Sequence, residues 1–276
     1  MARPLLVGIV NITADSFSDG GRFLAPEAAI AHAMALAADA DIVELGAAAS
    51  NVAAEPVSAD EEIRRLHPVI RALSGTGAPL AVDTSQPEVQ RFVMAHGVDY
   101  LNDIMGFPDP RLYPELAAGN CRLVVMHAVQ SQSRAQRLDL SADEAWQRIE
   151  AFFAARVEQL EAAGIARRRL ILDPGMGFFL STRAEASLRV LAGLGRLKRV
   201  FGLPVMVSVS RKSFLAAITG RQAPAERGAA TLAAELFAAA QGADYIRTHD
   251  PAALRDALAV AAALQSEAQR ISIANL

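Results

Sequence analysis

The chain has 276 residues, of which 52% are hydrophobic and 5% aromatic, and its formal net charge is −3 at pH 7. This length suits one large domain, and the small negative charge gives no electrostatic reason to bind nucleic acid or an anionic membrane surface. No segment approaches the length of a membrane span, and the single cysteine, Cys121, excludes an internal disulfide framework and a zinc site built from cysteines. The apolar run at residues 5–10 is too short for a signal peptide, so a cytoplasmic protein is expected.

Eight short apolar runs are predicted to form β-strands. They cover residues 5–10, 41–46, 79–83, 100–104, 122–127, 169–173, 204–208 and 243–248. Most are rich in Val, Ile and Leu, and a helix-like segment follows each one. Because their apolar residues are continuous rather than alternating, we expect parallel strands that are covered on both faces.

Several helix boundaries are also predicted. Ser/Thr-x-x-Glu capping boxes indicate helix starts at residues 58–61, 141–144 and 182–185. Gly97, Gly164 and Gly242 indicate left-handed helix ends that lead into the next strand. Pro68 lies inside a helical run, where we expect a kink or a break.

Eight strand–helix units without a long linker predict a single (β/α)8 TIM barrel, one domain over residues 1–276. The alternative is a doubly wound open sheet. A dinucleotide-binding sheet of that kind needs a glycine-rich turn directly after its first strand, and the pair Gly20 and Gly21 lies too far past Val10. The barrel is therefore preferred.

Polar side chains stand at the C-terminal end of every predicted strand, on the rim where such barrels carry their chemistry. They are Asn11, Glu44, Asp83, Asn102, Asp103, His127, Asp173, Ser208, Ser210, Lys212, Arg247 and His249. Any one of them could simply end a strand or cap a helix, as Asp and Asn do in many inert loops. All of them together on one rim favour a functional site.

The rim residues are sorted by charge along the chain. Acids and amides follow the earlier strands, whereas the cations Lys212, Arg247 and His249 follow the last two strands. The loops after these strands are the usual phosphate-binding corner of a barrel, and Arg247 and His249 point the same way because side chains alternate along a strand. We therefore favour an anion site, for a group such as pyrophosphate, over a surface Arg beside a capping His. Asn11 and the acids could hold Mg²⁺, which prefers oxygen ligands.

Two other chemistries suit these residues less well. Ser210 with His127 or His249 could suggest a nucleophilic triad, but the sequence has no Gly-x-Ser-x-Gly elbow. Lys212 could form a Schiff base, although its place beside Arg211 suits hydrogen bonding to a substrate better.

Five segments resemble the motifs of dihydropteroate synthases. They are Gly-Ile-Val-Asn-Ile-Thr-Ala-Asp-Ser-Phe-Ser-Asp-Gly-Gly at residues 8–21, Leu-Asn-Asp-Ile at 101–104, Leu-Asp-Pro-Gly-Met-Gly-Phe at 172–178, Val-Ser-Arg-Lys-Ser-Phe at 209–214 and Ile-Arg-Thr-His at 246–249. They keep that family's order and run nearly from end to end. The resemblance implies a folate-pathway transferase that joins hydroxymethyl-dihydropterin pyrophosphate to p-aminobenzoate and releases pyrophosphate.

The resemblance also implies roles for individual residues. The pterin would be hydrogen-bonded by Asp83, Asn102, Asp173 and Lys212, between apolar walls formed by Met126 and Met206. The pyrophosphate would be held by Asn11, Arg247 and His249, with Mg²⁺ shared with Asn11. The p-aminobenzoate would be bordered by Ser50, Phe178, Lys212 and Ser210. Catalytic charges would come from Asp83, Asp173, Lys212, Arg247 and His249, and a homodimer is expected.

Two loops depart from the family pattern. After the second strand, the usual Gly-Gly-Glu-Ser-Thr-Arg-Pro is replaced by residues 46–52, which puts Asn51 in place of an Arg, and Glu44 replaces an Asp. After Gly177, the usual Phe-Gly-Lys becomes Phe-Phe-Leu-Ser at residues 178–181. Both loops adjoin the expected p-aminobenzoate site and resemble the sulfonamide-insensitive branch of the family. The hypothesis is that Phe179 narrows the space for a sulfonyl substituent; neutral loop drift is the alternative.

Two rival functions share the fold or the ligand. One is a methyltransferase that moves a folate methyl group to a corrinoid, and the other is a non-catalytic pterin-binding protein. The methyltransferase has no need of Arg247 and His249 with Lys212, and the binding protein would tolerate the loss of Asn11, Arg247 and His249. The chain retains all of these residues. Their presence favours the transferase.

Overall fold

Eight parallel strands form one sheet, and their spatial order follows the chain. They are β1 (Leu5–Asn11), β2 (Ile42–Gly46), β3 (Leu80–Asp83), β4 (Tyr100–Asp103), β5 (Arg122–Met126), β6 (Leu170–Asp173), β7 (Met206–Val207) and β8 (Tyr245–Thr248). All but β1, which is one residue longer, lie inside the ranges predicted from the sequence. The computed structural model describes residues 3–13, 25–49, 56–129 and 138–274.

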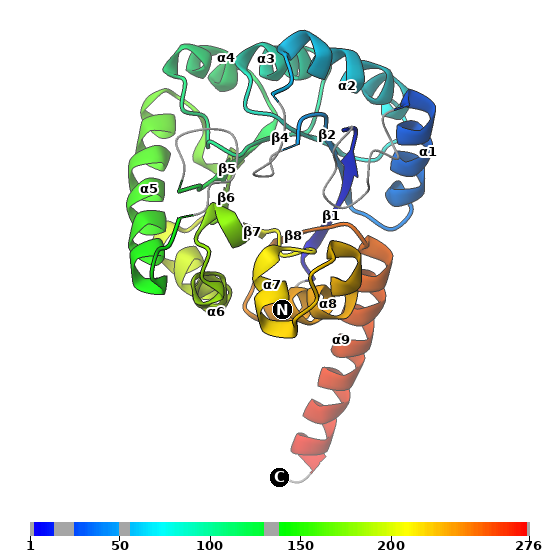
Figure 1. Ribbon diagram of the computed structural model, residues 1–276, viewed down its shortest axis with the longest axis vertical. Helices are drawn as coiled ribbons and strands as arrows, with labels where there is room; N and C mark the ends of the chain where they lie inside the picture. Colours follow the sequence, from blue (N-terminus) through cyan, green and yellow to red (C-terminus); the bar gives the residue numbers. More distant parts are fainter. Residues whose placement is uncertain (1–2, 14–24, 50–55, 130–137, 275–276) are drawn as a thin grey trace.

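The sheet closes on itself. Its strand order is β6-β5-β4-β3-β2-β1-β8-β7, and a parallel bridge between Leu172 in β6 and Val205, just before β7, joins the two ends. Figure 1 shows the resulting ring of strands with helices around its outside. The predicted (β/α)8 barrel is confirmed. A doubly wound sheet is excluded, because its strand order would reverse at a switch point.

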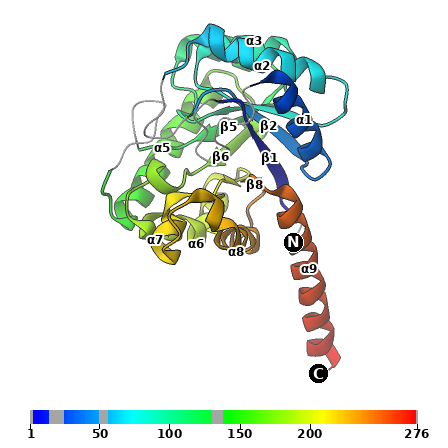
Figure 2. The ribbon, with the colours of Figure 1, turned by 45° about the vertical axis from the view of Figure 1, so that its right-hand side comes forward.

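Helices wrap the outside of the barrel. They are α1 (Pro26–Ala37), α2 (Ala59–Leu73), α3 (Pro87–Ala95), α4 (Tyr113–Ala118), α5 (Ala142–Ala162), α6 (Ala184–Phe201), α7 (Ser213–Thr219), α8 (Gly228–Ala240) and α9 (Pro251–Ala274). Figure 2 shows α9 leaving the body of the molecule, and its residues 262–272 are exposed. Within the described residues, no helix has both the length and the apolar content that crossing a membrane requires.

Side chains that point into the barrel form two layers. The lower layer is an apolar cluster of Val7, Ile42, Ala81, Val124, Ile171, Met206 and Tyr245. Because side chains alternate along a strand, the residue two positions later also points inward, one layer higher. On β2, β3, β6 and β8 these residues are Glu44, Asp83, Asp173 and Arg247. The apolar layer therefore fills the barrel below a polar layer at its C-terminal mouth.

The capping predictions had mixed outcomes. Ser141 begins α5 with a complete capping box, in which its hydroxyl accepts from the Glu144 N–H at 3.2 Å and the Glu144 carboxylate accepts from the Ser141 N–H at 2.9 Å. Ser58 caps α2, but the Glu61 carboxylate binds arginines of the same helix instead of completing the box. The box at Thr182 is wrong. The N-cap of α6 is the next residue, Arg183, whose side chain forms an ion pair of 2.6 Å with Asp139, in the segment just before α5.

Two further expectations concern glycine and proline. Gly97, Gly164 and Gly242 have φ values of 74°, 86° and 87°, which confirms the left-handed helix ends. Of the kink or break expected at Pro68, the break does not occur, since α2 continues through this residue to Leu73. The surrounding turns of α2 are buried, and this packing holds the helix together despite the lost backbone hydrogen bond.

Candidate active site

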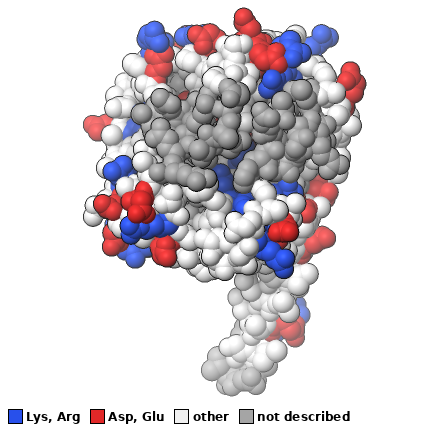
Figure 3. Space-filling model, viewed as in Figure 1, with Lys and Arg blue, Asp and Glu red and all other residues white. Residues whose placement is uncertain are grey.

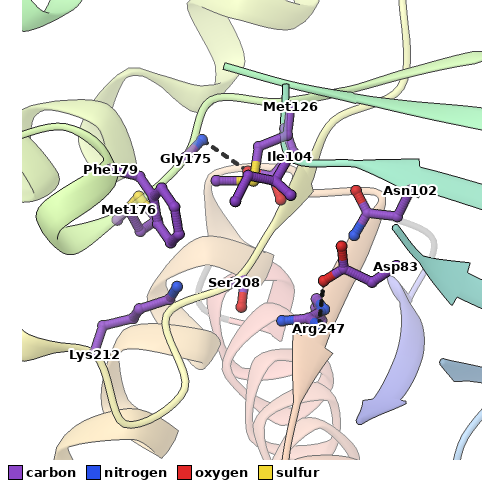
Figure 4. Close-up of a pocket in the computed structure, with 11 residues that line it drawn as sticks. Asp83, Asn102, Ile104, Met126, Gly175, Met176, Phe179, Ser208, Lys212 and Arg247 are labelled. Atoms are coloured by element: carbon purple, nitrogen blue, oxygen red, sulfur yellow. Dashed lines mark hydrogen bonds and ion pairs between the residues drawn. The ribbon is translucent and has the colours of Figure 1, made fainter. Parts of the chain in front are cut away.

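A cavity opens at the C-terminal mouth of the barrel. It is lined by Asp83, Asn102, Ile104, Met126, Asp173, Gly175, Met176, Phe179, Ser208, Lys212 and Arg247. Figure 4 shows Asp83, Asn102 and Arg247 on one side, facing Lys212, Met176 and Phe179 on the other. Figure 3 shows Lys and Arg side chains near the centre of this face of the molecule. A concave site with a few convergent polar groups is the usual form of a small-molecule site.

Most of the predicted pterin residues come together here, but Met206 does not. It lies in the apolar layer below, packed with Tyr245, and Ser208, the next inward residue of its strand, lines the cavity instead. Met176, which the sequence reading did not select, supplies an apolar wall opposite Asn102. Ser208 is one of the polar rim residues that the sequence indicated, and it points inward like Met206 because it follows that residue by two positions.

An ion-pair network holds the polar side of the cavity. The Arg247 guanidinium donates to one carboxylate oxygen of Glu44 and, over 3.1 Å, to Asp83. The other oxygen of Glu44 accepts from Asn102 Nδ2 at 3.1 Å. Glu44 is 1% exposed, so these bonds form away from water. Glu44, which stands where the family has an Asp, thus connects Asn102 of the predicted pterin site to Arg247 of the predicted anion site.

One acceptor of this network points to a ligand. Asn102 is buried and its amide nitrogen is occupied by Glu44, yet its Oδ1 has no hydrogen-bond partner among the described residues. Buried polar atoms are almost always paired, because leaving one unpaired costs free energy. Asn102 also lines the cavity, so this oxygen suits an N–H group of a bound molecule.

Burial changes the protonation of the two carboxylates at the cavity. It raises the pKa of Asp83 to about 7, which the nearby Arg247 opposes and the negative Glu44 reinforces. It also raises the pKa of Asp173 to about 6, although the Gly175 N–H donates to this carboxylate at 2.8 Å and Lys212 lies near it. Both groups therefore titrate close to neutrality, and a ligand that donates hydrogen bonds or carries positive charge would favour their ionised forms.

Lys212 faces the carboxylates from across the cavity. Burial and the positive charge of Arg247 lower its pKa to about 8, while Asp173 and Asp83 act in the opposite direction. Its ammonium lies 4.8 Å from the centre of the Phe179 ring, within the range of a cation–π contact. At pH 7 the lysine is mostly protonated and acts as a hydrogen-bond donor.

The remaining predicted residues lie around the rim. His249 follows β8, and its Nδ1 lies 2.8 Å from the buried Ser210 hydroxyl. Phe178 packs against the apolar group of Ile104, Met126 and Phe179 beside the cavity. Asn11 ends β1, whereas Ser50 lies outside the described residues. No group of three His, Cys, Asp or Glu residues able to hold a metal occurs in the described part of the chain.

Comparison with known proteins agrees with this site. The model of the pterin binding enzyme family matches residues 7–249. A type-2 dihydropteroate synthase of Escherichia coli is 56% identical, covering 96% of this chain and 97% of its own. The structure of the Xanthomonas albilineans dihydropteroate synthase with 4-aminobenzoic acid superposes with a TM-score of 0.85 at 40% identity, covering 95% of this chain and 93% of that one. A sulfonamide drug complex of the Yersinia pestis synthase gives a TM-score of 0.87 at 34% identity, covering 96% and 95%.

These matches run through all eight strands and include the cavity residues described above. The corrinoid methyltransferase and the non-catalytic binding protein lose their support, because the similar chains are synthases over almost their whole length. The chain belongs to the pterin binding enzyme family and, within it, to the dihydropteroate synthases.

Proposed function

We propose that this transferase of folate biosynthesis joins hydroxymethyl-dihydropterin pyrophosphate to p-aminobenzoate in the cavity at the barrel mouth. The observation that carries the proposal is the unpaired buried oxygen of Asn102, set among Asp83, Asp173 and Lys212. A pterin ring presents several N–H donors along one edge and acceptors on the other. Three oxygen acceptors and one ammonium donor around a single cavity complement that pattern.

Apolar contacts would hold the faces of the ring. Met126 and Met176 line the cavity, and the soft thioether of methionine adapts well to a flat aromatic ligand. Met176 thus provides the apolar wall that the sequence had assigned to Met206. Ile104 extends the same wall towards Phe179.

The pyrophosphate would bind at the rim next to Arg247 and His249. Arg247 would exchange a carboxylate partner for phosphate oxygens, and His249 and Asn11 would add hydrogen bonds. Mg²⁺, when bound, would neutralise charge on the departing pyrophosphate and would be held by Asn11 together with substrate oxygens and water. Mg²⁺ commonly binds through few protein ligands and several phosphates, which fits a site without a carboxylate cluster among the described residues.

The proposed reaction is a substitution at the pterin methylene carbon. The bond from this carbon to the pyrophosphate oxygen breaks, and both electrons leave with pyrophosphate. The amine nitrogen of p-aminobenzoate then bonds to the carbon and loses a proton. Asp83 and Asp173 would stabilise the positive pterin fragment, while Arg247, His249 and Lys212 would stabilise the negative leaving group. No covalent bond to the protein is required.

The p-aminobenzoate end would discriminate against sulfonamides. Phe179 is 6% exposed, lines the cavity and is backed by Ile104 and Met126, so its ring forms a fixed wall. We propose that this wall leaves room for the carboxylate of the substrate but not for a larger sulfonyl substituent. Phe178, Ser210 and Ser50 would border the same end.

A cytoplasmic homodimer is also part of the proposal. Large apolar side chains are exposed on three neighbouring helices, as Val200 on α6, Ile218 on α7 and Phe237 on α8. Such side chains suit burial against a second copy. Light scattering on the purified protein tests this assembly, and a monomeric mass would overturn it.

The decisive experiment measures pyrophosphate release by the purified chain. Release is expected only when the pterin pyrophosphate, p-aminobenzoate and Mg²⁺ are all present, and it should persist at sulfonamide concentrations that stop a sensitive synthase. Release that the sulfonamide inhibits would support the synthase activity and refute the proposed insensitivity. Pterin binding without release would leave a binding protein.

A further inference from the structure

The residue between two members of the site has an unusual backbone conformation. Arg211 separates Ser210 from Lys212, and its φ is 59°, in the left-handed region. In the described part of the chain it shares a positive φ with only one other non-glycine residue, Phe107. A side chain at a left-handed position is strained, and such strain persists only when the surroundings impose it.

Two side chains from another part of the barrel impose this conformation. The Arg211 N–H donates to the Thr231 hydroxyl at 3.0 Å, and the Arg211 carbonyl accepts from Arg227 Nη1 at 2.7 Å. Thr231 is 6% exposed and Arg227 is 3% exposed, so both bonds form away from solvent. Thr231 lies in the first turns of α8, and Arg227 directly precedes that helix.

Arg227 also holds the surrounding loop together. Its Nε donates to the Arg221 carbonyl at 2.9 Å, and its other terminal nitrogen donates to the Gln222 carbonyl. One guanidinium thus binds three backbone carbonyls on two segments that flank α7. The guanidinium does this with donors on three separate nitrogens, whereas all donors of a lysine are on one nitrogen.

The turn at Arg211 sets the direction of Lys212. The Lys212 N–H closes the turn by donating to the Val209 carbonyl at 3.1 Å, and Lys212 is the N-cap residue of α7. A change of conformation at Arg211 would rotate the chain just before Lys212 and move its ammonium relative to Asp173 and Phe179. The position of the ammonium therefore depends on the backbone of the preceding residue.

We propose that Thr231 and Arg227 are positioning residues, which hold Arg211 in its left-handed conformation and thereby aim the Lys212 ammonium into the pterin cavity. The inference rests on the proposed function, because it takes Lys212 as a pterin-binding group. Neither residue lines the cavity, so their effect on the substrate would pass through the backbone of Arg211.

The test compares Thr231→Val with Thr231→Ser, each alone and combined with Arg211→Gly. Thr231→Val keeps the size of the side chain and removes the acceptor of the Arg211 N–H. We expect KM for the pterin pyrophosphate to rise about tenfold, which corresponds to one lost buried hydrogen bond, whereas Thr231→Ser should stay within about twofold. Glycine adopts a positive φ without strain, so the valine change should matter less, about threefold, when it is combined with Arg211→Gly.

Controls separate positioning from general stability. Thr219→Val removes a hydroxyl at the exposed end of α7, which donates to the Leu215 carbonyl at 2.8 Å, and it should leave KM unchanged. A fall in melting temperature with unchanged KM for Thr231→Val would overturn the proposal, as would an equal effect of the valine change with and without Arg211→Gly. Should the valine variant not fold, Arg227→Lys with and without Arg211→Gly gives the same comparison. An inactive wild-type protein would instead count against the proposed function.

Discussion

The guanidinium of Arg247 on β8 binds the buried carboxylate of Glu44 on β2, and these two strands flank β1. This ion pair holds Arg247, the cation predicted to bind the leaving group, against a carboxylate that is shielded from water, since Glu44 is 1% exposed. The second oxygen of Glu44 holds Asn102 at 3.1 Å. A single acid therefore orients one residue from each half of the proposed substrate site.

Removal of this acid should destabilise the protein strongly. In Glu44→Ala, Arg247 loses one of its two carboxylates and Asn102 Nδ2 loses its acceptor, so a buried charge and a buried amide are left incompletely paired. We expect the free energy of unfolding to fall by about 3–5 kcal/mol, measured by urea denaturation. Glu61→Ala, which removes an ion-paired but only partly buried acid on α2, is the matched control and should change the free energy of unfolding little. Equal losses in the two variants would contradict the role assigned to Glu44.

The activity should depend on pH through both sides of the cavity. Carboxylates that accept from the pterin must be ionised, and the pKa values of about 7 for Asp83 and about 6 for Asp173 predict that kcat/KM rises as the pH increases through this range. The Lys212 ammonium must keep its proton, and its pKa of about 8 predicts that activity falls as the pH increases further. A bell-shaped profile is expected in assays of pyrophosphate release from about pH 5 to about pH 9.

Lys212→Arg isolates the alkaline side of that profile. Arginine stays protonated throughout this range, so the variant should be less active but should keep its activity above about pH 8. An unchanged alkaline decline would assign it to a group other than Lys212.

The raised carboxylate pKa values also predict a pH dependence of stability. An unfolded Asp releases its proton near the ordinary value of 3.8, whereas the folded protein keeps the protons on Asp83 and Asp173 until about pH 7 and about pH 6. The stability associated with the neutral forms is therefore present in acid and is lost as the pH rises through these values. Asp83→Asn should flatten the fall in unfolding free energy between about pH 4 and about pH 7, as measured by urea denaturation at each pH. A slope equal to that of the wild type would refute this origin.

The Phe179 wall makes a prediction about drug sensitivity. In Phe179→Gly the ring that lies 4.8 Å from the Lys212 ammonium is absent, so a sulfonyl substituent gains space. We expect the sulfonamide concentration for half inhibition to fall at least about tenfold, which corresponds to one well-packed contact. Phe178→Gly removes the same ring from the adjacent position beside the cavity and should have a smaller effect. Unchanged inhibition in Phe179→Gly would leave loop drift as the explanation.

The capping sequences at Ser141 and Thr182 form a natural pair for a stability test. Ser141→Ala removes a hydroxyl that accepts from the Glu144 N–H, and it should cost about 1 kcal/mol of unfolding free energy. Thr182→Ala changes a residue that is not a helix cap, and its loss should be clearly smaller. Melting and urea curves of both variants provide the comparison, and a larger loss for Thr182→Ala would contradict the capping assignment.

Much of the fold and of the site followed from the amino-acid sequence. Continuous apolar runs placed all eight strands, because strands buried on both faces exclude polar residues until the rim. The ends of the predicted strands and the family resemblance indicated Asp83, Asn102, Asp173, Lys212 and Arg247 as site residues, and the structure brings these together in one cavity. These residues meet because parallel strands of a closed barrel all end at the same rim.

Tertiary structure decided which neighbour each of these groups has. The sequence carries no signal that Glu44 binds Arg247 from 203 residues away, or that Thr231 accepts from Arg211. It also misplaced Met206, because a resemblance assigns a role to a position, whereas the alternation of the strand and the height of the layer determine which side chain reaches the cavity. Local patterns specify strands and caps through the backbone of a few adjacent residues. Ion pairs, raised pKa values and a strained φ depend on groups that only the closing of the barrel brings into contact.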